Sequence, residues 1–281
     1  MIKSLLKNIY YFLFDILILF RSFDHKYNFI VITPRLLSKL IKKSLIFDKI
    51  NKNFFTQYIR DDFDLITIYE IFSEESYNLK NFEIWKQIHE RFNSYSKENI
   101  KPLIIDCGSN IGSSSEYFKR CFTNAEIVMI EPDKNNLEFS KKNTLINEKF
   151  LINKAISSEE KLLKFSNKSI DNRAYKITND GNVDIKSITI ENILNLTVNE
   201  FKPFLIKIDI EGFEKDLFMK NYEWMKHFDI IIIELHDWML PNSHNSHNFI
   251  KSVNEISSDN INFDILISGE NLVLIKNDLN I

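Results

Sequence analysis

The chain has 281 residues, of which 44% are hydrophobic and 27% charged, and this suits one large globular domain or one domain with a substantial extension. Its 36 basic and 39 acidic residues leave a net charge of −3, which excludes the overall basic footprint of a nucleic-acid-binding protein. Its two cysteines, Cys107 and Cys121, form neither a disulfide framework nor a zinc-binding pattern, so we expect a reducing, cytoplasmic setting.

The first apolar stretch covers residues 9–20, IYYFLFDILILF. It is shorter than the ~20 residues of a membrane span, and it contains Asp15. Lys3 and Lys7 precede it as in a signal peptide, but no small-residue cleavage site follows. We expect a helix buried against the domain or against the sister subunit of a homodimer. The alternative is an interfacial helix that makes peripheral contact with the inner face of a membrane.

Residues 1–99 contain no glycine and only one proline. Apolar residues recur at helical spacing in LLSKLIKKSLIF (36–47) and FEIWKQIHERF (82–92), whereas DLITIYEIF (64–72) fits a strand as well as a helix. The pattern predicts that residues 1–99 form a mainly helical N-terminal extension, or cap, on an α/β domain of residues 100–281.

After residue 100, prolines border short apolar runs, as expected where parallel strands that are buried on both faces begin or end. The runs are LIID (103–106), AEIVMIE (125–131), FLIKIDI (204–210) and IIIIEL (230–235). They alternate with segments of helical character at 112–121, 133–148 and 213–227. This alternation predicts an α/β fold with a mostly parallel sheet. The turn dipeptide Ser268-Gly269, between FDILIS and NLVLIKN, adds an antiparallel hairpin at the C-terminus.

The first predicted strand of this sheet runs into the loop DCGSNIG (106–112). Gly108 allows a tight turn and a close approach of the backbone to a ligand, and Gly112 opens the following helix. The carboxylate of Asp106 would repel a pyrophosphate but favours a cationic ligand such as S-adenosylmethionine. Glu131, at the end of the next strand, is placed to accept both hydroxyls of a ribose. The alternative is an ordinary strand, turn and helix with a solvated Glu131.

Six motifs together resemble those of FkbM-type S-adenosylmethionine-dependent methyltransferases, over roughly residues 100–240. They are DCGSNIG, IEPD (130–133), NKAIS (153–157), ITIENIL (188–194), KIDIEGFE (207–214) and IIIELH (231–236). The resemblance implies a class I methyltransferase fold with a Rossmann-like sheet, and methyl transfer to a hydroxyl oxygen, often on a sugar. It further implies a set of cofactor-binding residues: Asp106, Gly108, Ser109, Asn110, Gly112, Glu131, Pro132, Ala155 and Asp209. Glu191 and Asn192 depart from the family's usual T-L-D-D segment.

In KIDIEGFE, Lys207, Asp209 and Glu211 alternate with isoleucines, so a strand would place all three on one face. Glu234 and His236 share a face at the end of the next apolar run in the same way. Because ligands of open α/β sheets lie at the carboxyl ends of the strands, we expect these side chains at the acceptor. The alternative is a self-satisfied ion-pair cluster around Lys207.

Methyl transfer to an alcohol requires removal of the acceptor proton, which a histidine or a carboxylate can accept. We therefore assign Asp209 or His236 as general base, Glu211 and Glu234 as orienting groups, and Lys207 as the residue that tunes the carboxylates. A second interpretation is that Asp209, Glu234 and His236, with Glu211, bind Mg²⁺ or Mn²⁺. Trp238 and Met239, just beyond, are candidates for a wall of the acceptor cleft.

The sequence thus predicts an S-adenosylmethionine-dependent enzyme that O-methylates a sugar hydroxyl, in a surface glycan or its activated precursor. The acceptor is a small molecule or a glycan and not a nucleic acid. Two alternatives stay open at this stage. One is N-methylation, or O-methylation of another small metabolite, and the other is a non-catalytic nucleoside-binding scaffold.

Overall fold

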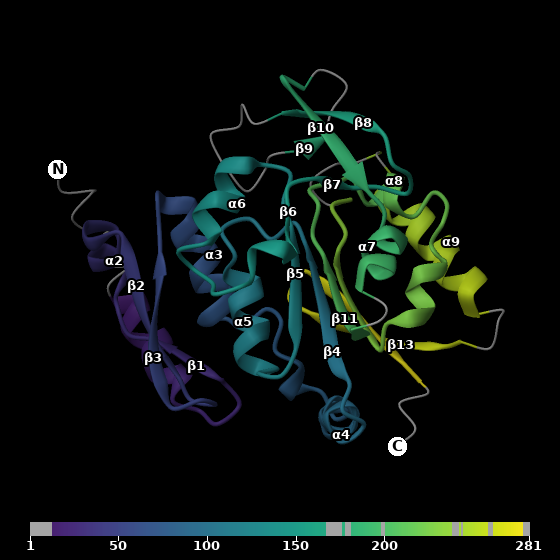
Figure 1. Ribbon diagram of the computed structural model, residues 1–281. Helices are drawn as coiled ribbons and strands as arrows, with labels where there is room; N and C mark the ends of the chain where they lie inside the picture. The colour runs from purple at the N-terminus through teal and green to yellow at the C-terminus, as the bar shows by residue number, and fades with distance from the viewer. Residues whose placement is uncertain are drawn as a thin grey trace.

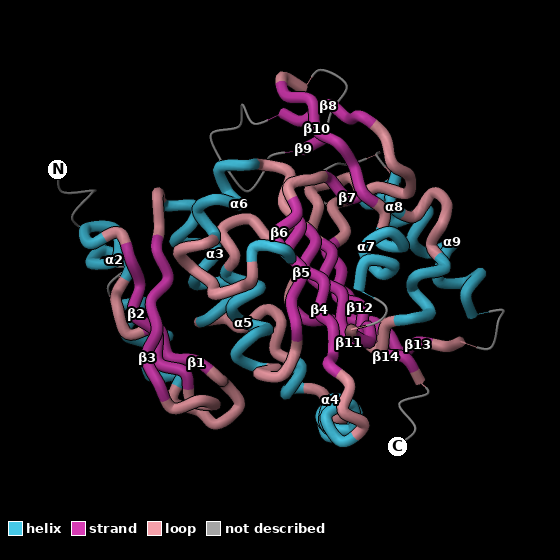
Figure 2. Tube along the Cα trace, in the orientation of Figure 1, coloured by secondary structure: helices cyan, strands magenta, loops and turns pink. Residues whose placement is uncertain are grey.

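The computed structural model describes residues 13–166, 176–177, 181–197, 200–237, 242, 244–257 and 261–277. Its centre is a seven-stranded sheet with helices on both faces (Figure 1). A three-stranded sheet near the N-terminus lies outside the helices of one face, and a four-stranded sheet stands above one end of the central sheet (Figure 2).

The strand order of the central sheet is β13-β14-β12-β11-β4-β5-β6, and among the described strands only β14 runs antiparallel to its neighbours. This order, with its one reversed strand, is that of the class I methyltransferase sheet. The predicted mostly parallel sheet and the hairpin at Ser268-Gly269 are therefore confirmed. The strands are β4 (Lys101–Cys107), β5 (Glu126–Ile130), β6 (Leu151–Ile152), β11 (Phe201–Ile208), β12 (Ile230–Glu234), β13 (Phe263–Ser268) and β14 (Asn271–Lys276).

The middle strands are apolar on both sides because helices cover both sides. The four isoleucines of β12 are fully buried. One face packs against α3 (Asp62–Phe72), α4 (Trp85–Lys97) and α5 (Ser113–Cys121). The opposite face packs against α7 (Ile190–Thr197), α8 (Glu214–Leu217) and α9 (Asn245–Ser257).

The helices that follow β5 and β11 are shorter than the sequence pattern predicts. In the segment 133–148, α6 covers only Lys134–Ser140. The 3₁₀ helix η2 (Glu148–Phe150) begins at the last residue of the segment. The segment 213–227 divides into α8 and the 3₁₀ helix η3 (Glu223–His227).

The N-terminal part contains an antiparallel sheet that the sequence pattern did not predict. Its strands β1 (Phe29–Val31), β2 (Lys43–Asp48) and β3 (Asn53–Tyr58) pair in chain order. The helix expected over 36–47 is wrong in its second half, because α2 (Arg35–Ile41) ends at Lys42, whose φ is +56°. In β2, buried and exposed positions alternate, which suits a strand and not a helix.

The ambiguous segment 64–72 is helical and belongs to α3. Asp61 caps this helix, because its side chain accepts hydrogen bonds from the backbone N–H groups of Phe63 and Asp64. The helix expected over 82–92 is present as α4, preceded by the 3₁₀ helix η1 (Leu79–Asn81). Side chains of α3 and α4 share one hydrophobic core with the central sheet, so this part of residues 1–99 packs directly on the α/β domain.

Of the apolar stretch 9–20, residues 9–12 lie outside the described part, and residues 13–22 form a helix. Ile18 and Asp15 are buried, but Leu17 and Phe20 are exposed. The expectation that this helix is buried against the domain therefore holds for only one of its faces. None of the described helices is long and apolar enough to cross a membrane.

A small sheet with the order β7-β10-β8-β9 stands above the carboxyl ends of the central strands (Figure 1). Its strands are β7 (Ala155–Ile156), β8 (Leu162–Ser166), β9 (Lys176–Ile177) and β10 (Val183–Ile188). Ala155, Phe165 and Ile185, which come from three of its strands, form a separate hydrophobic cluster. The insertion thus adds a wall to the edge of the sheet where the predicted site residues lie.

Candidate active site

One cavity of about 470 Å³ lies at the carboxyl ends of the central strands. It is lined from the central sheet, from the small sheet above it and from the N-terminal part of the chain. Most of the predicted site residues line it together: Gly108, Ser109, Asn110, Glu131, Pro132, Ala155, Lys207, Asp209, Glu211, Glu234 and His236. Two predicted residues, Asp106 and Gly112, do not. Trp238 and Met239 lie outside the described residues.

The loop after β4 is held against the end of β11. Gly108 has a φ of +79°, and a Cβ there would lie 1.8 Å from the backbone oxygen of Asp209. The Lys207 Nζ donates a hydrogen bond of 2.8 Å to the Gly108 carbonyl oxygen. Gly108 is therefore required because two backbone segments meet at this point, a reason that the sequence pattern did not contain.

Asp106 lies beneath the cavity, where it is fully buried. One carboxylate oxygen accepts hydrogen bonds of 2.6 Å from both Ser114 and Ser115, and the other lies 3.2 Å from the Lys207 Nζ. Although burial lowers the pKa of Lys207, the carboxylate of Asp106 raises it well above its usual range. Asp106 and Lys207 thus form a buried charged pair that joins β4, β11 and the start of α5.

Gly112 supports the loop through packing. Its φ is +84°, and a Cβ there would lie 3.0 Å from the Ser140 Cβ and 3.2 Å from side-chain atoms of Met129 and Thr144. The position lets α5 start close to α6 and β5. Gly112 and Asp106 therefore shape the loop from behind.

Glu131 faces the loop from the end of β5, and only 4% of it is exposed. Its Oε2 accepts a 2.9 Å hydrogen bond from the backbone N–H of Asn110, and its Oε1 accepts a 3.0 Å bond from that of Asp133. Burial raises the pKa of Glu131 to about 7, although these N–H groups favour the ionised form. Beside it, Ser109 Oγ and Asn110 Oδ1 are buried and lack a hydrogen-bond partner within the described part of the chain.

Asp209 and Glu211 do not share a strand face, so the alternation argument for them is wrong. Strand β11 ends at Ile208, and Glu211 and Gly212 have φ values of +56° and +91°. The chain leaves the sheet in a turn whose N–H at Asp209 donates to the Cys107 carbonyl oxygen at 3.1 Å. Both carboxylates nevertheless reach the cavity, because the turn and not the strand aims Glu211 at it.

His236 lies at the centre of a group of carboxylates and is 1% exposed. Its Nε2 is 3.7 Å from Asp209 Oδ1, 3.8 Å from Glu211 Oε2 and 3.6 Å from Glu234 Oε1. Burial lowers the pKa of His236, but its hydrogen bond to Glu214 and the surrounding negative charges raise it to about 9. Burial, and next the charge of Asp209, raise the pKa values of Glu211 and Glu234.

Glu214 is a site residue that the sequence analysis missed, although KIDIEGFE ends with it. It is fully buried, and its Oε1 lies 2.9 Å from His236 Nδ1 and accepts a 3.2 Å hydrogen bond from the Gly212 N–H. Its position depends on the turn that starts α8, which strand alternation does not predict. The available signal was a third acid in KIDIEGFE, two positions after the glycine.

The N-terminal part also contributes to the cavity wall, through Thr67, Glu70 and Ile71 of α3 and through Ser76 and Tyr77. None of these residues belongs to the six motifs, so the sequence offered no signal for them. The cavity wall is therefore built partly by residues 1–99.

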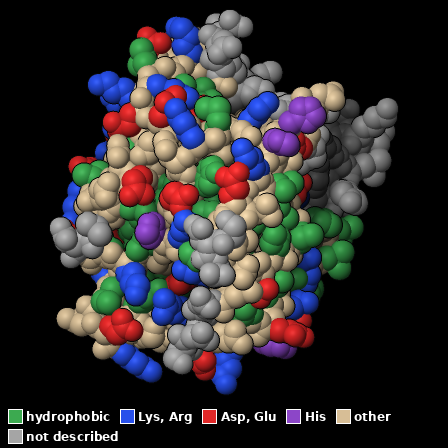
Figure 3. Space-filling view, turned by 90° about the vertical axis from the view of Figure 1, so that its right-hand side faces the viewer, with side chains coloured by type: hydrophobic (Ala, Val, Ile, Leu, Met, Phe, Trp, Pro, Cys, Tyr) green, Lys and Arg blue, Asp and Glu red, His purple; other side chains and the backbone are tan. Residues whose placement is uncertain are grey.

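Charged side chains of both signs are interspersed on the molecular face drawn in Figure 3, and neither sign forms a continuous field there. This distribution matches the small net charge of −3. The described residues on this face form no basic stripe of the kind that follows a nucleic acid backbone.

The family model of the methyltransferase FkbM domain matches residues 106–255, more than half of the 281 residues. The comparison with curated proteins found no match. The described strand order and the cavity at the carboxyl ends of the strands agree with the family match.

Solved methyltransferase structures show a distant likeness. The plantazolicin methyltransferase BpumL, in complex with a desmethylPZN analogue and SAH, is 12% identical, with 77% of this chain and 88% of that one covered and a TM-score of 0.40. The O-methyltransferase from Bacillus cereus in complex with SAH is 12% identical (77% and 92% covered, TM-score 0.36). SAH-bound PaMTH1 from Podospora anserina is 13% identical (78% and 89% covered, TM-score 0.37). By the family match, the chain belongs to the FkbM-domain methyltransferases.

Proposed function

We propose that this methyltransferase uses S-adenosylmethionine to O-methylate a sugar hydroxyl, in a surface glycan or its activated precursor. One observation carries the proposal: a single cavity joins Gly108 and Glu131 on one side to Asp209, Glu234 and His236 on the other. Methyl transfer needs the donor carbon and the acceptor oxygen ~3–3.5 Å apart, so the two sites must share one space.

The residues near the loop after β4 suit this cofactor. Glu131 offers a carboxylate to ribose hydroxyls. Ser109 and Asn110 also line the cavity, and their Oγ and Oδ1 atoms have no hydrogen-bond partner among the described residues. Pro132 and Ala155 add apolar surface for a base. When bound, S-adenosylmethionine supplies an electrophilic methyl group on a sulfonium.

The carboxylates at the ends of β11 and β12 suit an acceptor with several hydroxyl groups, because a carboxylate accepts hydrogen bonds on both oxygens. Asp209 is our candidate for the general base, with His236 as the alternative. The Asp209 side chain is 25% exposed and that of His236 only 2%, so the carboxylate is better placed to reach an acceptor oxygen. Glu211 and Glu234 then orient the hydroxyl groups, and Lys207, 3.4 Å from Asp209 Oδ2, positions the base.

Calorimetry with S-adenosylhomocysteine tests the cofactor, and incubation of nucleotide sugars and glycans with labelled S-adenosylmethionine tests the acceptor. We expect saturable binding of S-adenosylhomocysteine and transfer of the labelled methyl group to an oxygen of the acceptor. Label found only on amines would support N-methylation instead, and binding without any turnover would support a nucleoside-binding scaffold. In Asp209→Asn, turnover should be lost while the affinity for S-adenosylhomocysteine stays near that of the wild type. Full activity of this variant would remove Asp209 as the base.

We also propose that the N-terminal helices make a peripheral contact with the cytoplasmic face of a membrane. On helix 13–22, Leu17 and Phe20 are exposed, and on α2 so are Leu36 and Leu40. The two helices are joined where Arg35 binds Asp15. Three exposed basic residues lie in α2 or directly after it, and such residues favour contact with anionic lipids: Lys39, Lys42 and Lys43.

Sedimentation with vesicles tests this contact. The wild type should sediment with vesicles that contain anionic phospholipid more than with vesicles of phosphatidylcholine alone, and the double variant Leu17→Glu, Phe20→Glu should stay in the supernatant. If a second copy of the chain covers this face instead, sedimentation velocity will show a dimer that the double variant dissociates, and vesicle binding will be absent.

A further inference from the structure

Asp209, Glu234 and His236 each present one potential ligand atom, and these three atoms lie within 4.8 Å of one another. Ligands of a cation such as Mg²⁺, each at about 2.1 Å, are about 4.2 Å apart on opposite sides of the ion and about 3 Å apart in adjacent positions. His236 Nε2 lies 3.7 Å from Asp209 Oδ1 and 3.6 Å from Glu234 Oε1, so the ligand atoms would have to approach one another by less than about 1 Å to hold a cation. Their backbones are fixed by the neighbouring ends of the parallel strands β11 and β12.

His236 provides a second, independent observation. Its side chain is buried, and its Nε2 points at carboxylate oxygens that are 3.6 to 3.8 Å away, beyond hydrogen-bond distance. Its Nδ1 lies 2.9 Å from Glu214 Oε1. A carboxylate on one ring nitrogen commonly fixes the tautomer of a metal-bound histidine, with the lone pair of the other nitrogen facing the metal.

The charge balance of the cluster points the same way. Asp209, Glu211, Glu214 and Glu234 surround one imidazole. Lys207 is the only lysine within 4 Å of these carboxylates among the described residues, and it also pairs with Asp106. A divalent cation between the carboxylates would remove their mutual repulsion.

We propose that Asp209, Glu234 and His236 bind a divalent cation of the Mn²⁺ type on the acceptor side of the cavity. Two carboxylates with one imidazole suit Mn²⁺ better than Ca²⁺, which takes oxygen ligands alone. The inference rests on the proposed function, in which this side of the cavity holds the acceptor. It also revises the roles there, because Asp209 and His236 become ligands and Glu211, outside the triple, is left to accept the acceptor proton.

Electron paramagnetic resonance with Mn²⁺ alone tests the site. On titration of the full-length protein, the signal of free Mn²⁺ should fall until one ion is bound per chain. Glu234→Gln and His236→Gln should weaken the binding at least tenfold, and Glu214→Gln about tenfold through the loss of ring orientation. Glu200→Gln is the control, because Glu200 is an exposed carboxylate that does not line the cavity, and it should bind as the wild type does. Circular dichroism of each variant confirms folding.

The outcomes separate the two proposals. An unchanged Mn²⁺ signal at millimolar protein, or equal affinity in Glu234→Gln and the wild type, overturns the metal site. If S-adenosylhomocysteine still binds in that case, the proposed function stands. If Mn²⁺ binds but S-adenosylhomocysteine does not, the cofactor assignment fails and the metal site stands. Glu211→Gln should lose turnover with Mn²⁺ binding retained, and full turnover in this variant overturns the role of Glu211.

Discussion

The Nζ of Lys207 and the carbonyl oxygen of Gly108 are joined by a 2.8 Å hydrogen bond, although 99 positions separate the two residues in the chain. The same Nζ lies 3.2 Å from Asp106. The lysine of KIDIEGFE thus fixes the loop that forms one side of the cavity relative to the strand that forms the other. We propose that Lys207 positions both the loop and Asp209, which lies 3.4 Å from its Nζ.

Replacement of Lys207 by Met should lower the free energy of unfolding by about 3–5 kcal/mol, because Asp106 would remain buried without its cation. Urea denaturation measures this change. Lys202→Met, on the same strand but at an exposed position, should cost less than about 1 kcal/mol. Equal effects of the two substitutions would show that the buried pair of Asp106 and Lys207 does not add to the free energy of unfolding.

Gly108→Ala should lower the free energy of unfolding by about 3–5 kcal/mol. The left-handed backbone accounts for about 1–2 kcal/mol, and the contact of 1.8 Å with the backbone oxygen of Asp209 accounts for the rest. Gly269→Ala is a matched control, because Gly269 has a φ of +60° but open space around its Cβ position. It should show only the backbone cost, about 1–2 kcal/mol, in the same thermal and urea unfolding experiments. A Gly108→Ala variant as stable as the control would contradict the close contact.

The central sheet could be predicted from the sequence because its strands are buried on both faces and therefore appear as continuous apolar runs between turns. The convergence of Glu131, Asp209 and His236 followed from the parallel order, since the carboxyl ends of parallel strands meet at one edge. Glu214 could not be placed in this way. It reaches His236 through the turn at Glu211 and Gly212, and the alternation rule assumed that the strand continued through that turn.

The N-terminal sheet shows a different limit. The residue that separates α2 from β2 within one apolar stretch is Lys42, which adopts a left-handed conformation. A glycine at this position would have indicated the end of the helix, but a lysine does not. Helical and strand periodicity overlap in so short a run, so only the pairing with β1 and β3 decides between them. The residues of α3 that line the cavity belong to none of the six motifs, so the sequence did not indicate them either.

The affinity for S-adenosylhomocysteine should rise about tenfold between pH 6 and pH 8. Burial raises the pKa of Glu131 to about 7, so its carboxyl group is mostly protonated at pH 6 and mostly ionised at pH 8. Only the ionised form accepts hydrogen bonds on both oxygens, so binding strengthens as the proton is lost. Isothermal titration calorimetry at several pH values measures this change, and Glu131→Gln should abolish most of it.

The stability of the ligand-free protein should depend on pH with the opposite sign. The folded state binds the Glu131 proton more tightly than the unfolded state, in which the pKa is near 4.5. The contribution of this group is therefore fully present below pH 4.5 and is lost as the pH rises through about 7. Urea denaturation at several pH values measures this loss of stability.

In the binding experiment, an affinity for S-adenosylhomocysteine that does not change from pH 6 to pH 8 in the wild type would contradict a direct contact between Glu131 and the ligand.

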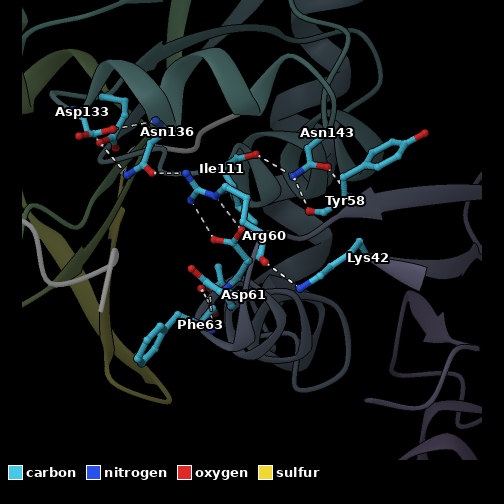
Figure 4. A network of polar contacts seen from close by, with 12 residues as sticks. Lys42, Tyr58, Arg60, Asp61, Phe63, Ile111, Asp133, Asn136 and Asn143 are labelled. Carbon is cyan, nitrogen blue, oxygen red and sulfur yellow. Dashed lines mark hydrogen bonds and ion pairs between the residues drawn. The ribbon is translucent and has the colours of Figure 1, made fainter. Parts of the chain in front are cut away.

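Arg60 links the N-terminal part to the cofactor side of the cavity (Figure 4). Its Nη1 donates a 2.8 Å hydrogen bond to Asn136 Oδ1, and the Nδ2 of Asn136 donates at 3.3 Å to Glu131 Oε1. Asp64 holds the guanidinium through Nε and Nη2, both at 2.9 Å. Arg60 does not itself line the cavity, so Arg60→Met should free the Asn136 amide and loosen Glu131 without replacing a lining residue.

We expect this variant to bind S-adenosylhomocysteine several-fold more weakly, because one neutral acceptor loses its charge-assisted partner and the orientation of Glu131 is relaxed. Lys42→Met is the control, since Lys42 donates only to the backbone oxygen of Arg60 at an exposed site. It should bind as the wild type does. If Arg60→Met unfolds at a lower temperature but keeps full affinity, Arg60 holds only the fold. If both affinity and the pH dependence of binding shift together, the contact through Asn136 positions Glu131 for the cofactor.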